Sequence, residues 1–489
     1  MRRDGKRVRL IAVLLLILTL IFAFSGCTAF AVRPADTGET GTAAQTTGSA
    51  EKEPSELVSL LLANEAIPAF NQTVVENIHY YYSHYFIGDL STDAELAAAI
   101  AEFYAEYREL IDETDQSEVT DLLCESYLAA AGDKYAYYMN PEAYAEYTSD
   151  MTGNYVGIGV EVTNDAVARI VTVTAVFPDT PAYEAGVLPG DTIEAVGDTS
   201  ASTISFAELV NRIRGEENTE VTVTFRRNGE SYTRTMIRRT VVQVTASASV
   251  LQGSPKIGLI RITKFNETTA PQFKAALDGL LAEGVDALIF DLRNNPGGLL
   301  SSILTVLDYL VPNGTPLANY EYYDGTVVYD VANARYFNPV YAKDSQGNVL
   351  RDEDGKPVYL DVDQTIPLDL PIAVLCNQHT ASAGELFTCA MQDYAREGIL
   401  DAVIVGTVTY GKGTMQTQVP LGSGCETTIS FALYNPPYSP NYEGTGITPD
   451  VPVELSEEAQ QKSIWALTDE EDVQMTAAIN SITERMVSE

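Results

Sequence analysis

The chain has 489 residues, too many for one ordinary domain, and this length predicts about three domains. Hydrophobic residues make up 45% of it and charged residues only 20%, a composition typical of globular proteins and not of disordered ones. The net charge is −38, and no cluster of Lys and Arg follows the first ten residues, which argues against a nucleic-acid partner. The acidity is compatible with solubility outside the cell.

The first residues have the order of a secretory signal. Five basic residues precede an apolar run over residues 10–24, which is shorter than the about 20 residues that a membrane-spanning helix needs. The run ends in Phe24-Ser25-Gly26-Cys27, which resembles a bacterial lipoprotein signal, although Phe24 stands where Leu is usual. That resemblance implies a signal segment at 1–26, a lipid on Cys27, and a chain anchored to the outer face of a bacterial cytoplasmic membrane. Cleavage after Ala29-Phe30-Ala31 or an uncleaved anchor would equally place the remainder beyond the membrane.

Residues 27–54 are rich in Thr, Gly, Ala and Glu, which predicts a flexible tether. Residues 55–150 show helical spacing of apolar residues and few strand-like runs, which predicts a helical N-terminal domain. We interpret the cluster Tyr80-Tyr81-Tyr82 within it as a helix-packing face, with an interaction surface as the alternative.

Cysteine spacing does not define a site in the rest of the chain. The cysteines after Cys27 are Cys124, Cys376, Cys389 and Cys425. Four such residues in an exported chain are able to pair, but buried thiols explain them equally well. Neither a metal nor an organic cofactor is implied.

Residues 151–243 predict a small β-rich domain, with short runs of β-branched residues between turn signals. Three motifs occur in a fixed order here: Gly157-Ile158-Gly159-Val160, Pro181-Ala182-Tyr183-Glu184-Ala185-Gly186-Val187 and Leu188-Pro189-Gly190-Asp191-Thr192-Ile193. Together they resemble a PDZ domain, a β-barrel-like module that binds the C-terminal tail of a peptide. In such a domain the first loop presents N–H groups to the terminal carboxylate, and the peptide adds as a strand to the sheet edge.

The resemblance implies a peptide site at Gly157, Ile158, Gly159 and Val160. The helix around Phe206, Leu209 and Ile213 is then either the other wall of the groove or ordinary core. A small β-domain whose glycines only make turns is the alternative interpretation.

Residues 244–455 alternate predicted strands and helices, which indicates an α/β domain. A polar, Tyr-rich stretch at about 320–369 predicts a β-hairpin insertion, and residues 456–489 predict an acidic helical tail. The whole chain is therefore expected to be a multidomain α+β protein.

Two turns in this domain follow predicted buried strands and precede helices. The strand Ala287–Arg293 runs into Pro296-Gly297-Gly298, where free N–H groups would suit a developing oxyanion, although a purely structural turn fits equally well. The strand Ile372–Leu375 leads to Ser382 at the start of a helix, a position where a serine on its own is usually an N-cap.

A third strand, Ala402–Val405, precedes Gly411-Lys412-Gly413. A lysine between two glycines is usually solvated on the surface. If Lys412 is buried instead, desolvation favours its neutral amine, which is then able to accept a proton from a serine. Gln416 lies four residues further on, where its side chain is able to hold the amine by a hydrogen bond.

The order of these motifs over residues 60–455 resembles the C-terminal (tail-specific) processing peptidases. The resemblance includes Asp133-Lys134-Tyr135 before the PDZ segment and Gly446-Ile447-Thr448-Pro449-Asp450 at the close. It implies a crotonase/ClpP-like α/β peptidase domain and a serine endopeptidase that cleaves exported proteins near their C-termini. Protein or peptide tails would be the partners, and the helical ends are similar to those through which relatives form homodimers.

The family also assigns roles. Ser382 would be the nucleophile, Lys412 the general base and Gln416 its support. The oxyanion would bind the N–H of Gly297 or Gly298 together with that of Ala383. Gly384 departs from the usual Ser at its position, and the separation of Ser382 from Lys412 is longer than usual.

Three alternatives remain open from sequence alone. His379 lies three residues before Ser382, so a Ser–His pair is conceivable if the backbone brings the two side chains within hydrogen-bond reach. An inactive protein that holds C-terminal tails would use the same PDZ motifs. A crotonase-like enzyme acting on small thioesters fits the α/β pattern but leaves the PDZ segment unexplained.

Overall fold

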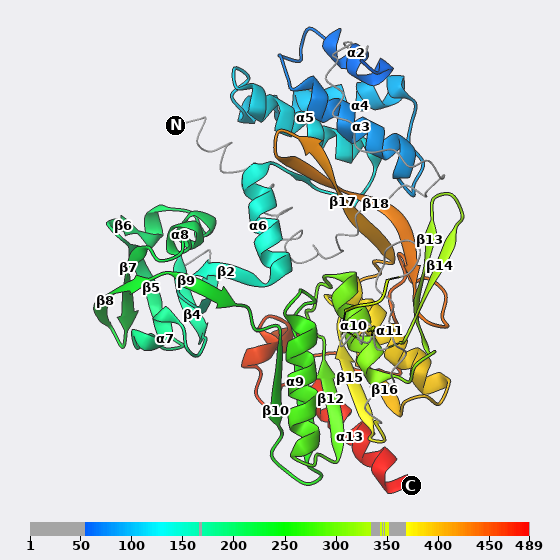
Figure 1. The fold of residues 1–489 in the computed structure, drawn as a ribbon. Coiled ribbons are helices and arrows are strands. Elements are labelled where there is room, and N and C mark those ends of the chain that lie inside the picture. The colour runs from blue at the N-terminus through cyan, green and yellow to red at the C-terminus, as the bar shows by residue number, and fades with distance from the viewer. Residues whose placement is uncertain are drawn as a thin grey trace. The chain divides into compact units, whose positions relative to one another are not determined.

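The computed structural model describes residues 54–165, 169–333, 343–344, 346, 348–351 and 368–488 (Figure 1). One compact unit is residues 148–244, and the described residues before and after that segment form the other. The predicted signal segment, Cys27 and nearly all of the tether lie outside the described residues, as does most of the predicted insertion.

The N-terminal part of the larger unit is helical, as its apolar spacing predicts. Its elements are α2 (Glu56–Leu62), α3 (Gln72–Tyr85), α4 (Asp93–Tyr107), η1 (Arg108–Leu110), α5 (Gln116–Ala131) and β1 (Tyr138–Met139). The helix α6 (Pro141–Thr152) begins in this unit and ends within residues 148–244. In the tyrosine cluster, Tyr82 is buried and its hydroxyl donates to Asp133 Oδ2 at 3.1 Å, whereas Tyr80 is exposed. Packing therefore accounts for Tyr82, the last residue of that cluster.

A six-stranded sheet forms the centre of the α/β part. Its order is β10 (Ala246–Val250), β11 (Ile257–Ile262), β12 (Ala287–Asp291), β15 (Ile372–Cys376), β16 (Ala402–Gly406) and β19 (Val451–Pro452). All neighbouring pairs are parallel except β10–β11. Such sheets are stable only when helices cover both faces, which explains why these strands are apolar runs rather than alternating patterns.

The two faces of this sheet have separate cores. Leu288 and Phe290 pack with α9 (Thr269–Ala282), α10 (Leu300–Leu310) and α11 (Ala383–Arg396). The alternate residues Ala287 and Ile289 share a core with Ala478 and Ile482 of α13 (Val473–Ser488). In the tail, α12 (Glu457–Gln460) and η3 (Ile464–Ala466) precede α13, and α13 packs on this face of the sheet (Figure 1).

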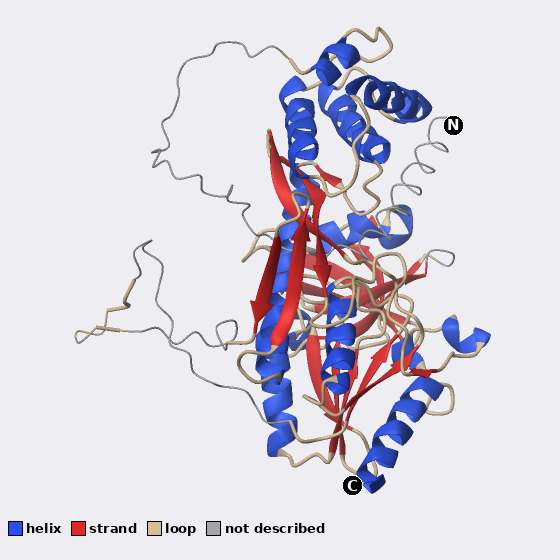
Figure 2. Cartoon of the chain, turned by 90° about the vertical axis from the view of Figure 1, so that its right-hand side faces the viewer, coloured by secondary structure: helices blue, strands red, loops and turns tan. Residues whose placement is uncertain are grey.

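A second sheet contains β17 (Thr414–Gly422), β18 (Cys425–Asn435), β13 (Pro316–Tyr322) and β14 (Val327–Val331), with β1 at one edge. The strands β13 and β14 pair as an antiparallel hairpin at the start of the stretch where an insertion is predicted. Figure 2 shows long strands rising from the α/β part toward the N-terminal helices. The strands β17 and β18 contribute Val419, Leu421 and Ile429 to the helical core, so these helices do not close their core alone.

Residues 148–244 form the β-rich unit that the sequence predicts. Its elements are β2 (Asn154–Gly157), β3 (Val160–Asp165), β4 (Ile170–Val176), α7 (Pro181–Glu184), β5 (Thr192–Val196), β6 (Thr199–Ser200), η2 (Ala201–Thr203), α8 (Phe206–Ile213), β7 (Glu220–Arg227), β8 (Glu230–Ile237) and β9 (Arg239–Val242). The main sheet runs β3-β4-β5-β7-β8, and β2 pairs with β9. Strand β3 is thus an edge strand.

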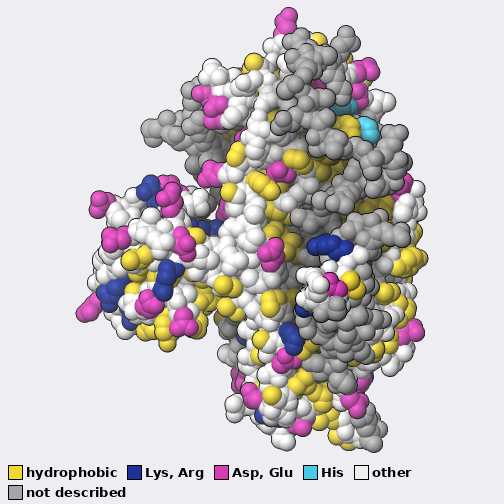
Figure 3. Space-filling model, in the orientation of Figure 1, with side chains coloured by type: hydrophobic (Ala, Val, Ile, Leu, Met, Phe, Trp, Pro, Cys, Tyr) yellow, Lys and Arg dark blue, Asp and Glu magenta, His cyan; other side chains and the backbone are white. Residues whose placement is uncertain are grey.

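The four cysteines in the described part of the chain are buried and unpaired, which fits the buried-thiol interpretation. Among the helices that the structure describes, none combines the length and apolarity needed to span a bilayer. On the face drawn in Figure 3, Lys and Arg side chains lie scattered among acidic ones.

Candidate active site

The three turns singled out in the sequence leave the same edge of the parallel sheet. The register places Asp291 of β12 beside Leu375 of β15, and Cys376 beside Gly406 of β16. Since these strands are parallel and end nearly level, the loops that follow them begin side by side. The carboxyl edge of a parallel sheet is where α/β proteins generally bind ligands.

Hydrogen bonds of ordinary length join these loops to one another. The Asn377 side chain donates to Asn294 Oδ1 at 2.8 Å and accepts from the Asn294 N–H at 3.0 Å. The Ala381 N–H donates to the Asn295 carbonyl at 2.9 Å, and the Tyr410 N–H donates to the Thr380 carbonyl at 3.0 Å. The three turns are therefore joined to one another by hydrogen bonds.

Ser382 occupies a strained turn at the start of α11. Its φ is 53° and its ψ is −122°, a conformation that non-glycine residues rarely adopt and that costs on the order of 1–3 kcal/mol. A serine on a sharp strand-to-helix turn is the arrangement that exposes nucleophiles in several hydrolases. Ser382 is fully buried, at 0% exposure.

The Pro-Gly-Gly turn lies directly against Ser382. A Cβ placed on Gly297, whose φ is 101°, would lie 2.6 Å from Ser382 Cβ and 2.9 Å from the Ala383 nitrogen. Within the described part of the chain, the N–H groups of Gly298 and Ala383 donate to no acceptor, whereas the Gly297 N–H donates to Asn295 Oδ1 at 2.8 Å. Of the two glycines named from sequence, Gly298 is therefore the one with an N–H free for an oxyanion.

The buried carboxylate of Glu385 connects the serine turn to the lysine turn. Its Oε2 accepts from the Ser382 N–H at 2.9 Å and from the Lys412 N–H at 2.8 Å. Its Oε1 accepts from the Gly411 N–H and from the Thr409 hydroxyl, both at 2.6 Å. Burial raises the pKa of Glu385, and hydrogen bonds from Thr409, Lys412, Gly411 and Ser382 oppose that rise.

The rest of the Gly411-Lys412-Gly413 turn is held by side chains from other elements. The Gly413 N–H donates to Glu443 Oε2 at 2.7 Å. The Tyr135 hydroxyl donates to the Gly411 carbonyl at 3.2 Å, and the Tyr434 hydroxyl donates to the Lys412 carbonyl at 2.9 Å. Lys412 itself is 2% exposed, with its Nζ 5.0 Å from the ring centroid of Tyr135. The solvated-surface interpretation of this lysine is therefore wrong.

Gln416 lies at the start of β17 and is buried. Its amide Nε2 donates to Thr414 Oγ1 at 3.1 Å and to Ser430 Oγ at 3.0 Å, and no hydrogen bond joins it to Lys412. Ser430 Oγ donates in turn to Asp133 Oδ1 at 2.7 Å. This network fixes which end of the amide is the donor, and it leaves the carbonyl oxygen as the free acceptor.

His379 is exposed, and its ring Nε2 lies 3.4 Å from the side-chain nitrogen of Gln378. No hydrogen bond joins it to Ser382. Because the serine is buried and the imidazole faces outward, the geometry does not support a Ser–His pair.

The sequence interpretation gave no role to Glu385, Thr409 or Ser430. Glu385 carries a local signal that is easy to miss, because Ser-x-x-Glu at a helix start is the capping-box pattern. Ser430 and Thr409 carry none, since their partners are distant in the sequence.

In the smaller unit, the loop of Gly157, Ile158, Gly159 and Val160 connects β2 to β3. The N–H groups of Ile158 and Gly159 donate to no acceptor in the described residues, while their carbonyls accept from Ala182 and Phe177. Gly159 has a φ of 82°, and a Cβ there would lie 2.2 Å from Thr180 Cβ. The helix α8 buries Leu209 and Ile213 in the core of the unit and leaves Phe206 partly exposed.

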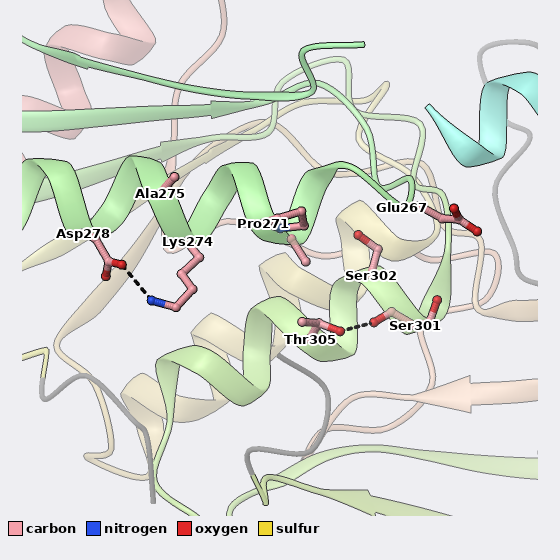
Figure 4. A pocket seen from close by; sticks show the side chains of 9 residues that line it. Glu267, Pro271, Lys274, Ala275, Asp278, Ser301, Ser302 and Thr305 are labelled. Carbon is pink, nitrogen blue, oxygen red and sulfur yellow. Dashed lines mark hydrogen bonds and ion pairs between the residues drawn. The ribbon is translucent and has the colours of Figure 1, made fainter. Parts of the chain in front are cut away.

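A cavity of about 460 Å³ lies between α9 and α10 (Figure 4). Lys274 and Asp278 pair on one side of it, and Ser302 and Thr305 lie on the other. None of the candidate catalytic residues lines this cavity.

Comparison with known proteins agrees with both units. Residues 256–453 match Peptidase family S41, and residues 172–227 match the PDZ domain. A carboxy-terminal-processing protease of Bartonella bacilliformis is 31% identical, over 66% of this chain and 67% of its own length. The chain belongs to peptidase family S41.

Two further relatives carry similar names. A carboxyl-terminal-processing protease of Synechocystis sp. is 28% identical over 75% of this chain and 77% of its own length. The chloroplastic carboxyl-terminal-processing peptidase 2 of Arabidopsis thaliana is 27% identical over 69% of this chain, and the match spans 61% of that protein. This S41 protein is thus a serine-type, C-terminal processing peptidase, and the interpretations as an inactive tail-binding protein or a thioester enzyme lose their support.

The contact between the Pro-Gly-Gly turn and Ser382 generates a prediction. In Gly297→Ala the added methyl must displace the Ser382 Cβ or strain the turn. We expect peptidase turnover on an unstructured protein to fall by at least ~100-fold, because a shift of about 1 Å at reacting groups has that effect.

The control is Gly284→Ala, which also has positive φ (68°) but no atom within 4 Å of the added Cβ. It should lose stability without losing turnover. Wild-type turnover in a folded Gly297→Ala protein would contradict this placement of the turn.

Proposed function

We propose that this S41 peptidase cleaves exported proteins near their C-termini, with Ser382 as nucleophile and Lys412 as general base. The observation that carries the proposal is the shared carboxylate oxygen that binds the main-chain N–H groups of both residues. Both residues are buried, and main-chain positions joined by one carboxylate oxygen support proton transfer between their side chains.

The proposed reaction begins when Ser382 Oγ attacks the scissile carbonyl and its proton passes to the neutral amine of Lys412. Burial disfavours the charged form of an amine, which makes a lysine a competent base at neutral pH. The N–H groups of Gly298 and Ala383 stabilise the oxyanion. Lys412 then returns the proton to the leaving amine and activates the water that hydrolyses the acyl-enzyme.

Gln416 has a supporting role in this proposal. Its Nε2 is occupied by Ser430 and Thr414, so its carbonyl oxygen is the end that is free to accept from the lysine amine. Asp133 and Ser430 would thereby select the orientation of the amide that Lys412 requires.

The dyad is tested by three single variants assayed on an unstructured protein substrate. Ser382→Ala and Lys412→Met should reduce cleavage to background, because each removes a group that the first step needs. The methionine is similar in length to lysine and apolar, so it suits the buried position.

The matched control is His379→Ala, which should keep most of the activity because the imidazole is exposed. Residual turnover in Lys412→Met together with loss of turnover in His379→Ala would overturn the dyad assignment.

We propose further that residues 148–244 recognise the free C-terminal carboxylate of the substrate. Two observations support this: the N–H groups of Ile158 and Gly159 lack acceptors in the described residues, and β3 has an unpaired edge. Successive free N–H groups in a loop form a concave anion site, and an extended tail adds to an edge strand by main-chain hydrogen bonds.

This role predicts a difference between two peptides that share one sequence. Binding to full-length Ser382→Ala protein, measured by calorimetry, should be at least ~10-fold tighter for the free carboxylate than for the C-terminal amide, because a charge-assisted hydrogen bond is worth about 1.5–3 kcal/mol. Equal affinities for the two peptides would rule out carboxylate recognition.

We also propose that a lipid on Cys27 holds the protein at the outer face of a bacterial cytoplasmic membrane. The support is the charged-then-apolar order of residues 1–26 followed by cysteine. In native cells, Cys27→Ser should lose incorporation of labelled fatty acid and appear in the soluble fraction. Unchanged labelling in that variant would exclude Cys27 as the lipidation site.

A further inference from the structure

The carboxylate of Glu385 is the most heavily hydrogen-bonded buried acid around the two turns. It accepts four hydrogen bonds of 2.6–2.9 Å, and its residue is 0% exposed. Three of the four donors are main-chain N–H groups, which are unable to rotate away or become acceptors. An acceptor-only group with two oxygens is what this site requires.

These donors come from separate segments. The Ser382 N–H lies at the start of α11, whereas the Gly411 and Lys412 N–H groups belong to the turn after β16. Thr409, the fourth donor, also accepts from the Ile447 N–H at 2.7 Å. Glu385 thus fixes the distance between the serine and lysine backbones directly, rather than through the sheet below them.

We infer that ionised Glu385 is a positioning residue that sets the alignment of Ser382 with Lys412. This inference rests on the proposed dyad. It predicts that the negative charge and both oxygens are needed for turnover, over and above their effect on folding.

Glu385→Gln is the direct test, because the amide nitrogen must face main-chain N–H groups in either orientation. At Oε2 it would oppose two of them, and at Oε1 it would oppose the Gly411 N–H. We expect kcat to fall by at least ~100-fold while KM stays within about 2-fold, since alignment of the reacting groups changes and substrate contacts do not.

Asp393 offers a matched control on the same helix. It is 1% exposed and accepts from the main-chain N–H groups of Tyr438 and Ser439 and from the Ser439 hydroxyl, but it binds neither Ser382 nor the lysine turn. Asp393→Asn should lower the melting temperature to a similar degree as Glu385→Gln and leave kcat close to wild type. Equal losses of kcat in the two variants would reduce Glu385 to a structural role.

A second pair of variants applies even if Glu385→Gln fails to fold. Thr409→Val removes one donor to Oε1, and Thr409→Ser retains it. The valine variant should lose kcat at constant KM, and the serine variant should recover it. If both behave as wild type, the inference is overturned.

Different results would overturn the dyad and the positioning role of Glu385. Turnover in Lys412→Met would overturn the assignment of Lys412 as the base, and with it the positioning role. An active wild type, an inactive Lys412→Met and an unaffected Glu385→Gln would leave the dyad standing and remove only the positioning role of Glu385.

Discussion

The site depends on the level ends of three parallel strands. Because β12, β15 and β16 are parallel and in register, the Pro-Gly-Gly, serine and lysine turns begin at one edge, although they are far apart in the sequence. Helices on both faces exclude water from the strands. They also fix the register, because a slip by one residue would turn each strand's side chains toward the opposite core. The sheet therefore determines where the three turns begin, and the hydrogen bonds between the loops determine how the turns lie against one another.

The lysine turn has a second requirement, because it is buried without belonging to a regular element. Each main-chain polar group of Gly411, Lys412 and Gly413 has a partner, supplied largely by Glu385, Glu443, Tyr135, Tyr434 and Asn441. Buried peptide groups without partners are costly. These side chains together replace the water that an exposed turn would use.

Sequence patterns predicted the elements well, because strand runs and helical spacing are local. The resemblance to the processing peptidases named Ser382, Ala383 and the Pro-Gly-Gly turn, and the structure places them at one edge of the sheet. Sequence patterns could not decide whether the Gly297 or the Gly298 N–H is available for the oxyanion, because this depends on which N–H donates to the Asn295 side chain. The partners of Gln416 were beyond them too, since Ser430 and Asp133 meet it only through long-range pairing of β17, β18 and the helical region.

The β17–β18 hairpin has a mechanical consequence. Its outer part shares a core with the N-terminal helices through Val419, Leu421 and Ile429, and its inner part, with Met415 and Phe431, belongs to the core of the α/β sheet. Gln416 and Ser430 lie on the inner part, between those two anchorages. A paired ribbon resists bending in its own plane, so a tilt of the helices would either break strand pairing or displace Gln416 and Ser430. The position of Gln416 therefore depends on the packing of the N-terminal helices as well as on the α/β sheet.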